Sequence, residues 1–478
     1  MLEESAASVP TSDDVLFERA QLLLSEGQAL ESRGDARGAM MKYEACRAAG
    51  QAMQDQGYAQ AVEAAALGSL GTAYDSLGQY DKATEHLTAA LAISREIGDR
   101  QGEGSGLANL GVVHLTSLND PAAALPFIQE AAAAFDAIWS GCRTDEQLVS
   151  IGDTTMPTII ASNLQLAYVQ LGQPEAALEA AERARSRAFE LLLAQQRSQL
   201  TSPVAVAPVL QRQATGVAAV DVTVLRSLAV RQGAALVIFS VVGNVGQMQL
   251  FAWLVRSSAD SPLVFKQVTI PEHETSLTQL VELTRCKLGV RARDAAPKAD
   301  RGVKLSVGSL VVAEALATPT IDKQKLEVQL GQRSEDALLR RCHELLIAPL
   351  SDELANETSL IIIPDRDLYA LPFAALRDGN GTHLIEKHTL RIAPSAGTLI
   401  ELEQRVASRM AGDDGKPAAL VVGDPSFHRK DLPPLTDLRE KASQYRWAHQ
   451  LPGARAEADE VVKKLQAEHR TTYLYRDQ

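Results

Sequence analysis

The chain has 478 residues, enough for about two to four domains, and 46% of them are hydrophobic, so a sizeable core can form. Its net charge of −13 argues against a general binder of nucleic acid or of anionic membranes, because phosphate binding requires a basic surface. The 4 cysteines are widely separated, with no C-x-x-C spacing and no clustered histidines, which argues against a disulfide framework or a zinc site. We therefore expect reduced thiols, a cytoplasmic location, no metal and no cofactor.

The first part of the chain, to about residue 200, contains a repeated pattern. One copy begins at Leu70-Gly71, includes Tyr74 and Gly78, and continues with Ala83, Leu87 and Ala90. Related copies run from Gly27 to Cys46, from Leu110 to Ala131 and from Leu164 to Ala184. In the copy that begins at Leu110, one inserted residue shifts the second half of the pattern.

This pattern predicts pairs of antiparallel helices. Small residues such as Gly71 and Ala83 let the two helices approach closely, and Leu87 fills the space between them. Gly78 supplies the left-handed conformation that ends the first helix. Each pair leaves an apolar face that only the next pair can cover, so the pairs stack into a solenoid. The pattern resembles tetratricopeptide (TPR) repeats, longer than the standard repeat and similar to the kinesin-light-chain style.

The resemblance to TPR repeats implies a binding groove. Such grooves hold a peptide or a helix with residues from the first helix of each pair. By register, six residues are expected to face inward: Gln28, Glu31, Thr72, Asp75, Val112 and Leu115. Their mixture of acids and small residues gives no recognisable code, so a solvated face is the alternative interpretation.

Beyond the repeats the spacing of the hydrophobic residues changes. Residues 180–193 predict a long helix with Arg183, Arg185 and Arg187 on its polar side. We assign residues 201–232 to a linker, on the basis of the prolines and small residues in 201–221. Two strands are then predicted, at 234–242 and 247–255, joined by a glycine-containing hairpin turn.

The last third of the chain alternates helices and buried strands. Helices are predicted near 275–290 and 335–352, with a surface insertion at 291–320 between them. Leu360 to Ile363 is a buried strand, and Ser395 caps a helix that runs to about Met410. Strands at 418–422 and 471–475 flank an amphipathic helix at 451–465. Strand, helix and strand in this order predict a βαβ unit with a parallel sheet.

Five motifs in this region carry a second resemblance. They are Pro364-Asp-Arg-Asp-Leu followed by Leu371-Pro-Phe, then Ala393-Pro-Ser, Leu420-Val-Val-Gly-Asp-Pro and Leu451-Pro-Gly-Ala-Arg. In this order and after helical repeats, they resemble the CHAT domain, a caspase-like module usually carried behind TPR repeats. The resemblance implies an α + α/β fold: an all-α TPR solenoid with a joining helix at 1–200, then a caspase-like domain with a mostly parallel sheet. A non-catalytic α/β unit is expected at 233–410, and the start of a second unit, incomplete at the C-terminus, at 411–478.

The resemblance also bears on catalysis. In the CHAT family the catalytic His and Cys lie further along, in a His-Gly segment and a segment of small residues with Cys, and this sequence stops at Gln478 before either. The dyad therefore has no match here, and we expect no catalytic residue and no peptidase activity in residues 1–478.

The remaining candidates have structural interpretations. Cys342 and His343 are adjacent on a predicted helix, so their side chains point about 100° apart and cannot form a nucleophile–base pair. His383 and His388 flank a strand-like stretch and have no nearby cysteine. Ser395 lacks a Gly-x-Ser-x-Gly elbow.

Three functions remain open. The first is a protein-interaction and regulatory module, in which the TPR repeats bind a protein or peptide and the partial CHAT domain serves as a scaffold. The second is the N-terminal part of a TPR-regulated cysteine endopeptidase of the caspase–separase type. The third is a cargo or cytoskeletal adaptor that acts through the repeats alone. Nucleic acid and membrane are not expected as partners, whereas self-association is expected through an uncovered sheet edge at the strand 471–475.

Overall fold

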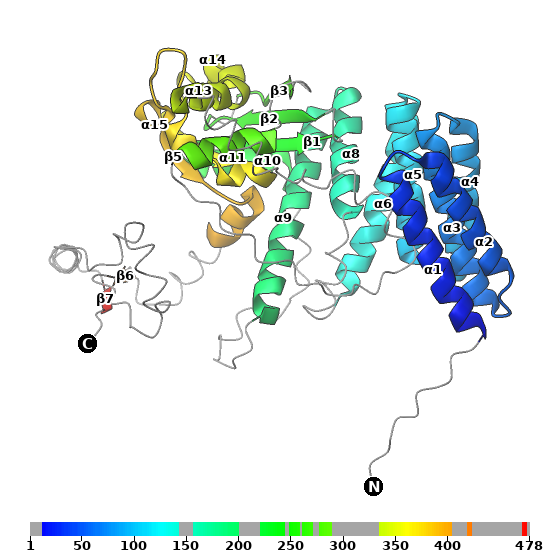
Figure 1. Cartoon of the computed structure of the whole chain (residues 1–478). Helices are drawn as coiled ribbons and strands as arrows, with labels where there is room; N and C mark the ends of the chain where they lie inside the picture. Colours follow the sequence, from blue (N-terminus) through cyan, green and yellow to red (C-terminus); the bar gives the residue numbers. More distant parts are fainter. Residues whose placement is uncertain are drawn as a thin grey trace, which may run out of the picture. The chain divides into compact units, whose positions relative to one another are not determined.

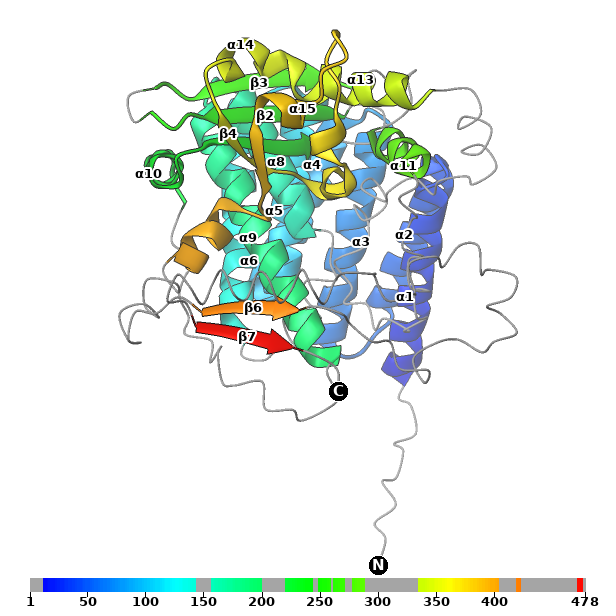
Figure 2. The same cartoon turned by 90° about the vertical axis from the view of Figure 1, so that its left-hand side faces the viewer.

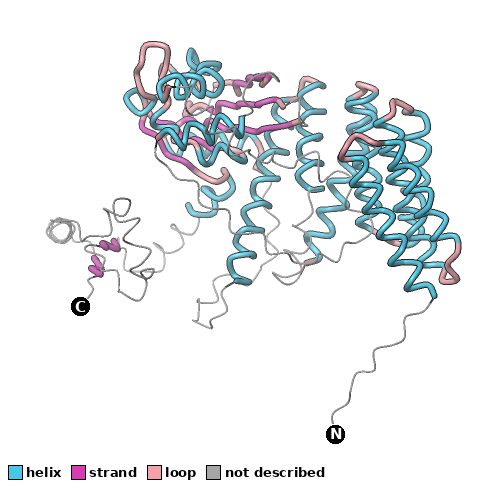
Figure 3. The backbone as a smooth tube through the Cα atoms, viewed as in Figure 1, coloured by secondary structure: helices cyan, strands magenta, loops and turns pink. Residues whose placement is uncertain are grey.

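A computed structural model describes residues 12–142, 156–199, 220–243, 248–258, 261–270, 277–288, 334–403, 418–422 and 471–475. The chain divides into two compact units, Met1–Leu399 and Ile400–Gln478. The first unit contains the helical repeats and a five-stranded sheet, and the second contains a pair of strands (Figure 3). Among the helices described, none is long and apolar enough to cross a membrane.

The repeats form consecutive helix pairs, seen side by side in Figure 1. The helices are α1 (Ser12–Glu31), α2 (Ala36–Gln51), α3 (Gln56–Ser76), α4 (Tyr80–Ile97), α5 (Arg100–Val112), α6 (Pro121–Gly141), α8 (Met156–Gln170) and α9 (Pro174–Gln199). A short π-helix, η1 (Val113–Ser117), continues α5. The helices start at polar caps where the sequence provides them, as at Asp55, whose side chain accepts a hydrogen bond from the N–H of Tyr58 at 3.0 Å. This helical array matches the predicted solenoid.

Each pair turns at a residue in the left-handed region. These residues are Gly34, Gly78 and Gly172, with φ of 81°, 71° and 71°, and Asn119, with φ of 52°. Glycine adopts this conformation without steric cost, and asparagine tolerates it better than most residues. The turn glycine predicted at Gly78 is therefore confirmed, and Asn119 takes the same role in the third repeat.

Within three of the pairs, a glycine on the first helix meets a large side chain on the second. A Cβ atom at Gly71 would lie 2.6 Å from Cγ of Leu87, and equivalent clashes arise between Gly27 and Tyr43 and between Gly111 and Ile128. In the fourth pair the sizes are exchanged, with Gln165 and Ala181 at the corresponding positions. The close helix approach predicted from small residues is thus present, and it depends on glycine in three repeats.

The π-helix accounts for the residue inserted in the third repeat. From Gly71 to the turn at Gly78 there are 7 positions, whereas from Gly111 to the turn at Asn119 there are 8. The extra residue lies where the helix widens to π geometry, and the N–H of Leu118 bonds the carbonyl of Val113 at 2.9 Å. The second helix of the repeat, α6, then begins normally at Pro121 after its cap Asp120.

The sheet of the first unit is mixed, with strand order β3-β2-β1-β4-β5 (Figure 2). Its strands are β1 (Ala235–Val242), β2 (Gln249–Val255), β3 (Val264–Thr269), β4 (Ser359–Ile363) and β5 (Thr389–Ile392). β1 pairs with β4, and β4 with β5, in parallel, while β2 and β3 run antiparallel to their neighbours. The predicted hairpin of β1 and β2 is present, and within this sheet parallel pairing is limited to β1, β4 and β5.

Helices cover both faces of the central strand, whose residues are all buried. On one face, Val237 and Phe239 pack with α11 (Leu277–Lys287) and α13 (Glu335–Leu346) in the main core. On the other face of the sheet lie α8 and α9. Trp253 of β2, which pairs with Ile238 of β1, donates its indole N–H to the carbonyl of Pro174 in α9 at 2.9 Å. The remaining short helices are η2 (Ala348–Leu350), α14 (Ser351–Leu354), η3 (Arg366–Ala370), η4 (Phe373–Ala375) and α15 (Leu384–Lys387). The last repeat is therefore also a layer of the α/β part.

In the second unit, β6 (Ala418–Val422) pairs in parallel with β7 (Thr471–Tyr475), and both strands have the predicted bounds. The helix predicted at 451–465, the insertion at 291–320 and the turn at 244–246 lie outside the described residues.

Three expectations need correction. The end of the assigned linker is a helix, α10 (Val222–Gln232), which Asp221 caps. The strand-like stretch between His383 and His388 is the helical turn α15, and the strand follows it as β5. Arg185 is buried rather than on a polar side of α9, because residues two apart on a helix are separated by about 200° and cannot share one face.

Candidate functional site

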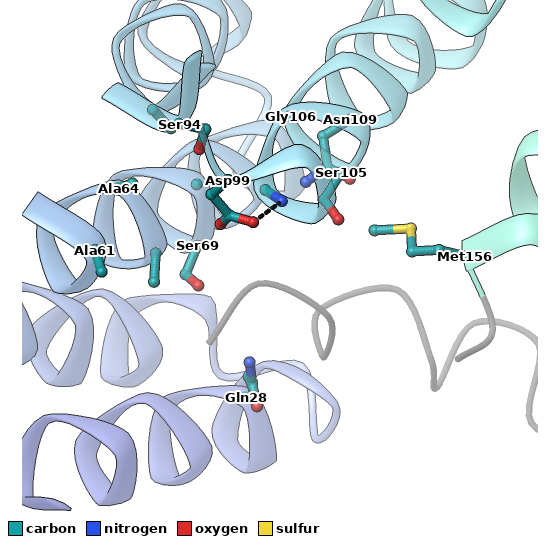
Figure 4. A pocket seen from close by; sticks show the side chains of 14 residues that line it. Gln28, Ala61, Ala64, Ser69, Ser94, Asp99, Ser105, Gly106, Asn109 and Met156 are labelled. Carbon is teal, nitrogen blue, oxygen red and sulfur yellow. Dashed lines mark hydrogen bonds between the residues drawn. The ribbon is translucent and has the colours of Figure 1, made fainter. Parts of the chain in front are cut away.

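The first helices of the repeats enclose a small cavity of about 60 Å³, shown in Figure 4. Its walls come mainly from the middle of α3 and α5, with Gln28 of α1 and Met156 of α8 at its ends. The residues from α3 and α5 are mostly small: Ala61, Ala64, Ala65, Gly68, Ser69, Gly102, Ser105, Gly106 and Asn109. Such a surface lets the backbone of a bound segment approach closely. We call this surface the repeat groove.

Polar groups are available in the repeat groove. Ser105 is buried, and its hydroxyl has no hydrogen-bond partner among the described residues. Asn109 lies one turn further along α5 and is also buried. In contrast, the Asp99 carboxylate is used by the fold, because it caps α5 by accepting the N–H of Gly102 at 2.9 Å. A buried hydroxyl without a partner costs free energy, which a ligand could recover by hydrogen bonding.

Three residues predicted for the groove lie on this surface or next to it. Gln28 lines the cavity. Thr72 is one turn beyond Ser69 on α3 and donates to the Ser69 carbonyl at 2.9 Å. Val112 is half-buried, three residues beyond Asn109 on α5. The cavity itself is lined by small residues that come before Thr72 on α3 and before Val112 on α5. Sequence register did not predict these residues. Their recurrence as Gly, Ala and Ser at helical spacing is the sequence pattern that could have indicated them.

Two predicted acids, Glu31 and Asp75, link neighbouring repeats. Each stands three residues before the left-handed turn residue of its repeat. Glu31 accepts hydrogen bonds from the hydroxyls of Tyr43 at 2.8 Å and Ser76 at 3.5 Å. Asp75 accepts one from Ser117, which stands in the third repeat where Ser76 stands in the second. We call this repeated contact the acid–serine ladder.

Burial raises the pKa of both ladder acids. For Glu31 desolvation is the largest cause, opposed by the hydrogen bonds from Tyr43 and Ser76, and the negative charge of Asp75 raises its pKa further. For Asp75 desolvation is again the largest cause, opposed by the Ser117 hydrogen bond. One carboxylate oxygen of Asp75 is buried and has no hydrogen-bond partner among the described residues. Neither pKa shift includes a contribution from a basic side chain, so burial destabilises the ionised form of both acids without a cation to offset it.

Leu115 does not face the groove, contrary to expectation. It is 1% exposed and belongs to the core of the third and fourth repeats. The π-helix is the physical reason, since its wider turn rotates the residues that follow relative to α-helical register.

A second polar cluster lies at the carboxyl ends of β1 and β4, where the Pro364-Asp-Arg-Asp-Leu motif begins. Asp365 accepts the N–H of Val241 at 2.8 Å and so bridges the two strands. Asp367 accepts the Thr278 hydroxyl at 2.5 Å from α11, and Leu368 is fully buried. Arg366 between them has a φ of 48°, which is unusual for a residue other than glycine. Asp365 and Asp367 of the motif thus stabilise the contacts between the strands and between the sheet and α11.

A buried ion pair on α9 borders this cluster. Nε of Arg185 lies 2.9 Å from Glu182, and its Nη1 donates to the Phe239 carbonyl of β1 at 2.5 Å. The other oxygen of Glu182 accepts the N–H of Ala396 at 2.9 Å, at the start of the helix 396–403 that Ser395 caps. The capping role predicted for Ser395 is confirmed by its bond from the Thr398 N–H at 3.0 Å.

The described cysteines and histidines form no nucleophile–base pair. Cys342 is buried beside Thr284, and burial raises the pKa of its thiol to about 11. His383 and His388 bond the backbone carbonyls of Ala375 and Glu357 at 2.9 Å and 2.6 Å. Within the described part of the chain, no group of three His, Cys, Asp or Glu residues is placed to hold a metal ion. Cys342, His383 and His388 thus make contacts within the fold.

Comparison with known families agrees with both resemblances. Residues 336–477 match the CHAT domain, and residues 62–137 match a tetratricopeptide repeat family. No curated protein matches the chain. Among solved structures, the crystal structure of BtubC (BKLC) from P. vanneervenii is similar at 17% identity and a TM-score of 0.23. The similarity covers 42% of this chain and 98% of that chain. The chain therefore combines a TPR region with a caspase-like CHAT region, as its sequence predicts.

Proposed function

We propose that this chain is a protein-interaction module that binds an extended segment of a partner protein in the repeat groove, with the CHAT region as its attached scaffold. The observation that carries the proposal is the cavity of about 60 Å³ lined by small residues, with the unpaired hydroxyl of Ser105 in its wall. TPR repeats in general mediate interactions of this kind.

The ladder acids indicate the charge of the bound segment. Glu31 lies one turn beyond the groove residue Gln28 on α1, and Asp75 lies two turns beyond the groove residue Gly68 on α3. A lysine or arginine of the partner, placed beside Glu31 and Asp75, would stabilise their ionised forms, which burial disfavours in the unbound chain. We therefore propose a partner segment with small residues over the cavity and a basic residue next to them.

The proposal is tested with a random peptide library displayed on phage and selected on the purified full chain. The matched variants are Gly68→Leu, which projects into the groove, and Ala133→Leu on the exposed surface of α6. A Cβ at Gly68 meets nothing nearer than the Ala90 Cβ at 4.0 Å, so the first carbon of the new side chain fits, and a urea midpoint of the variant checks that the chain is folded.

We expect selected peptides to contain Lys or Arg and to lose affinity for the Gly68→Leu variant but not for Ala133→Leu. A double change of Glu31→Gln and Asp75→Asn should lower both the affinity and its dependence on salt, since two charges are removed. Peptides that bind the Gly68→Leu variant as well as the parent chain would contradict the groove assignment.

A further inference from the structure

A second cavity, of about 200 Å³, lies outside the repeat groove, between the third and fourth repeats and the ends of β1 and β2. Three parts of the fold supply its lining. Thr116 and Asn119 come from η1 and the turn after it, Asn163 and Gln170 come from α8, and Gly243 and Gln249 come from the ends of β1 and β2. We call it the junction pocket.

The junction pocket lies where the acid–serine ladder stops. In the first two steps, an acid three residues before one turn contacts a serine two residues before the next turn. At the third step the corresponding residues are Thr116 and Gln170. The Thr116 hydroxyl instead donates to the Val112 carbonyl of its own helix at 2.9 Å. The contact that closes the earlier repeats is therefore replaced by an open space.

Carboxamides dominate the lining. Among the described residues, the side chains of Asn119, Asn163 and Gln170 have no hydrogen-bond partner, while Gln249 uses its oxygen to accept from Gln267 at 2.9 Å. Each carboxamide offers two N–H donors and an acceptor oxygen. No charged residue and no aromatic ring lines the pocket. The pocket thus presents donors and acceptors together without a net charge.

The walls of the junction pocket are fixed by backbone contacts. The N–H of Gly243 donates to the Ser162 hydroxyl at 3.2 Å, which ties β1 to α8 at the rim. The backbone of Asn119 is held in the left-handed turn, and the next N–H, of Asp120, bonds the His114 carbonyl at 2.8 Å. A preformed site of this kind loses little entropy on binding.

We propose that the junction pocket binds main-chain amide groups of a short extended peptide segment. A peptide unit carries one donor and one acceptor, which a carboxamide can satisfy at two points. Phosphates, carboxylates and cations would lack a compensating charge in this lining, and sugars or nucleobases would lack an aromatic ring on which to stack. The volume is below the roughly 300–1,000 Å³ of sites for drug-sized molecules, which fits a short stretch of backbone.

The test uses N-acetylglycine methylamide, a diamide without a side chain, titrated into the ¹⁵N-labelled full chain. Side-chain NH₂ resonances of Asn163 and Gln170 report binding. We expect saturable shifts of these resonances, and an affinity about tenfold lower when Asn119→Gly and Gln170→Ala remove two carboxamides. Asn119→Gly keeps the turn, because glycine accepts its positive φ.

The control variant is Gln60→Ala on α3, whose carboxamide lies outside the pocket and donates to Glu96 at 3.3 Å, and it should leave the titration unchanged. A second probe, methyl glucoside, is neutral and rich in hydroxyls but has no amide, and we expect no saturable shift with it. The proposal is overturned if the diamide produces no saturable shift, if the glucoside binds as well, or if the Asn119→Gly and Gln170→Ala variant binds like the parent chain. Urea midpoints of all variants show whether each is folded during the titration.

Discussion

Glycine at the contact between the two helices of a repeat determines how closely they pack. Gly71 faces Leu87, which is fully buried, and no space remains there for a methyl group. Gly68, one turn earlier on the same helix, has room for a methyl group, whose nearest neighbour would be the Ala90 Cβ at 4.0 Å. Both glycines lie in the middle of α3 and so cost the helix a similar free energy, but only Gly71 is required for packing. Substitutions at the two positions therefore distinguish the two effects.

We expect Gly71→Ala to destabilise the chain by about 1–3 kcal/mol, the usual cost of overpacking a core. The new Cβ would be 2.6 Å from Cγ of Leu87 and 3.2 Å from the backbone oxygen of Ala83. Gly68→Ala should be neutral or stabilise by up to about 1 kcal/mol, since alanine favours the helix more than glycine. Urea unfolding of both variants measures the difference; a lower midpoint for Gly68→Ala than for Gly71→Ala would contradict this account.

The raised pKa of Glu31 predicts a dependence of stability on pH. Because its pKa is higher in the folded chain than the ordinary 4.5, the folded state favours the neutral acid. The stabilisation from this group is therefore complete below the unfolded pKa and is lost as pH rises through the folded pKa. Glu31→Gln should remove this loss, so its urea midpoint should fall less than that of the parent chain between about pH 4 and pH 7. Glu44→Gln, exposed on α2, is the control and should keep the parent profile.

At the scale of the element, the sequence predicted secondary structure best where a residue type or an apolar run is typical of one kind of structure. Gly78 predicted a turn, and the apolar run at Leu360 to Ile363 predicted a buried strand, and both are present. β3 and β5 were not predicted, because their polar, half-exposed residues, such as Lys266 and Arg391, give no clear apolar pattern. The junction pocket was not predictable either, since its lining comes from three elements that only the tertiary fold brings together.

The π-helix η1 makes a prediction about deletions. Removing Thr116, which is exposed, should return the helix to α geometry and restore the spacing found in the second repeat, so we expect a folded chain. Removing Ala108, which is 3% exposed in α5, should rotate one half of that helix by about 100° and expose its buried face. Circular dichroism and urea midpoints compare the two deletions. If the two deletions lower the urea midpoint equally, the π-helix does not serve to accommodate the extra residue.

At the scale of the whole first unit, α9 belongs to two structures at once. Its partner α8 lines the repeat groove through Met156, and α9 itself contacts the sheet through Arg185 and the helix 396–403 through Glu182. The side chain of Glu182 is 0% exposed and that of Arg185 is 7% exposed. A pair this deeply buried is costly to break, because the remaining charge has no solvent to stabilise it. The repeats and the sheet should therefore unfold together.

Arg185→Met tests this coupling, since it leaves Glu182 buried without its cation. We expect a loss of about 3–5 kcal/mol, much of which should be recovered when Glu182→Gln is added, because the second change removes the unpaired charge. Arg183→Met, on the exposed side of α9, is the matched control and should change stability little. Hydrogen exchange in urea should show β1 and α3 opening together in the parent chain, and β1 opening first in the Arg185→Met variant. Equal stability of the Arg183→Met and Arg185→Met variants, or unchanged exchange of β1, would show that the ion pair does not join the repeats to the sheet.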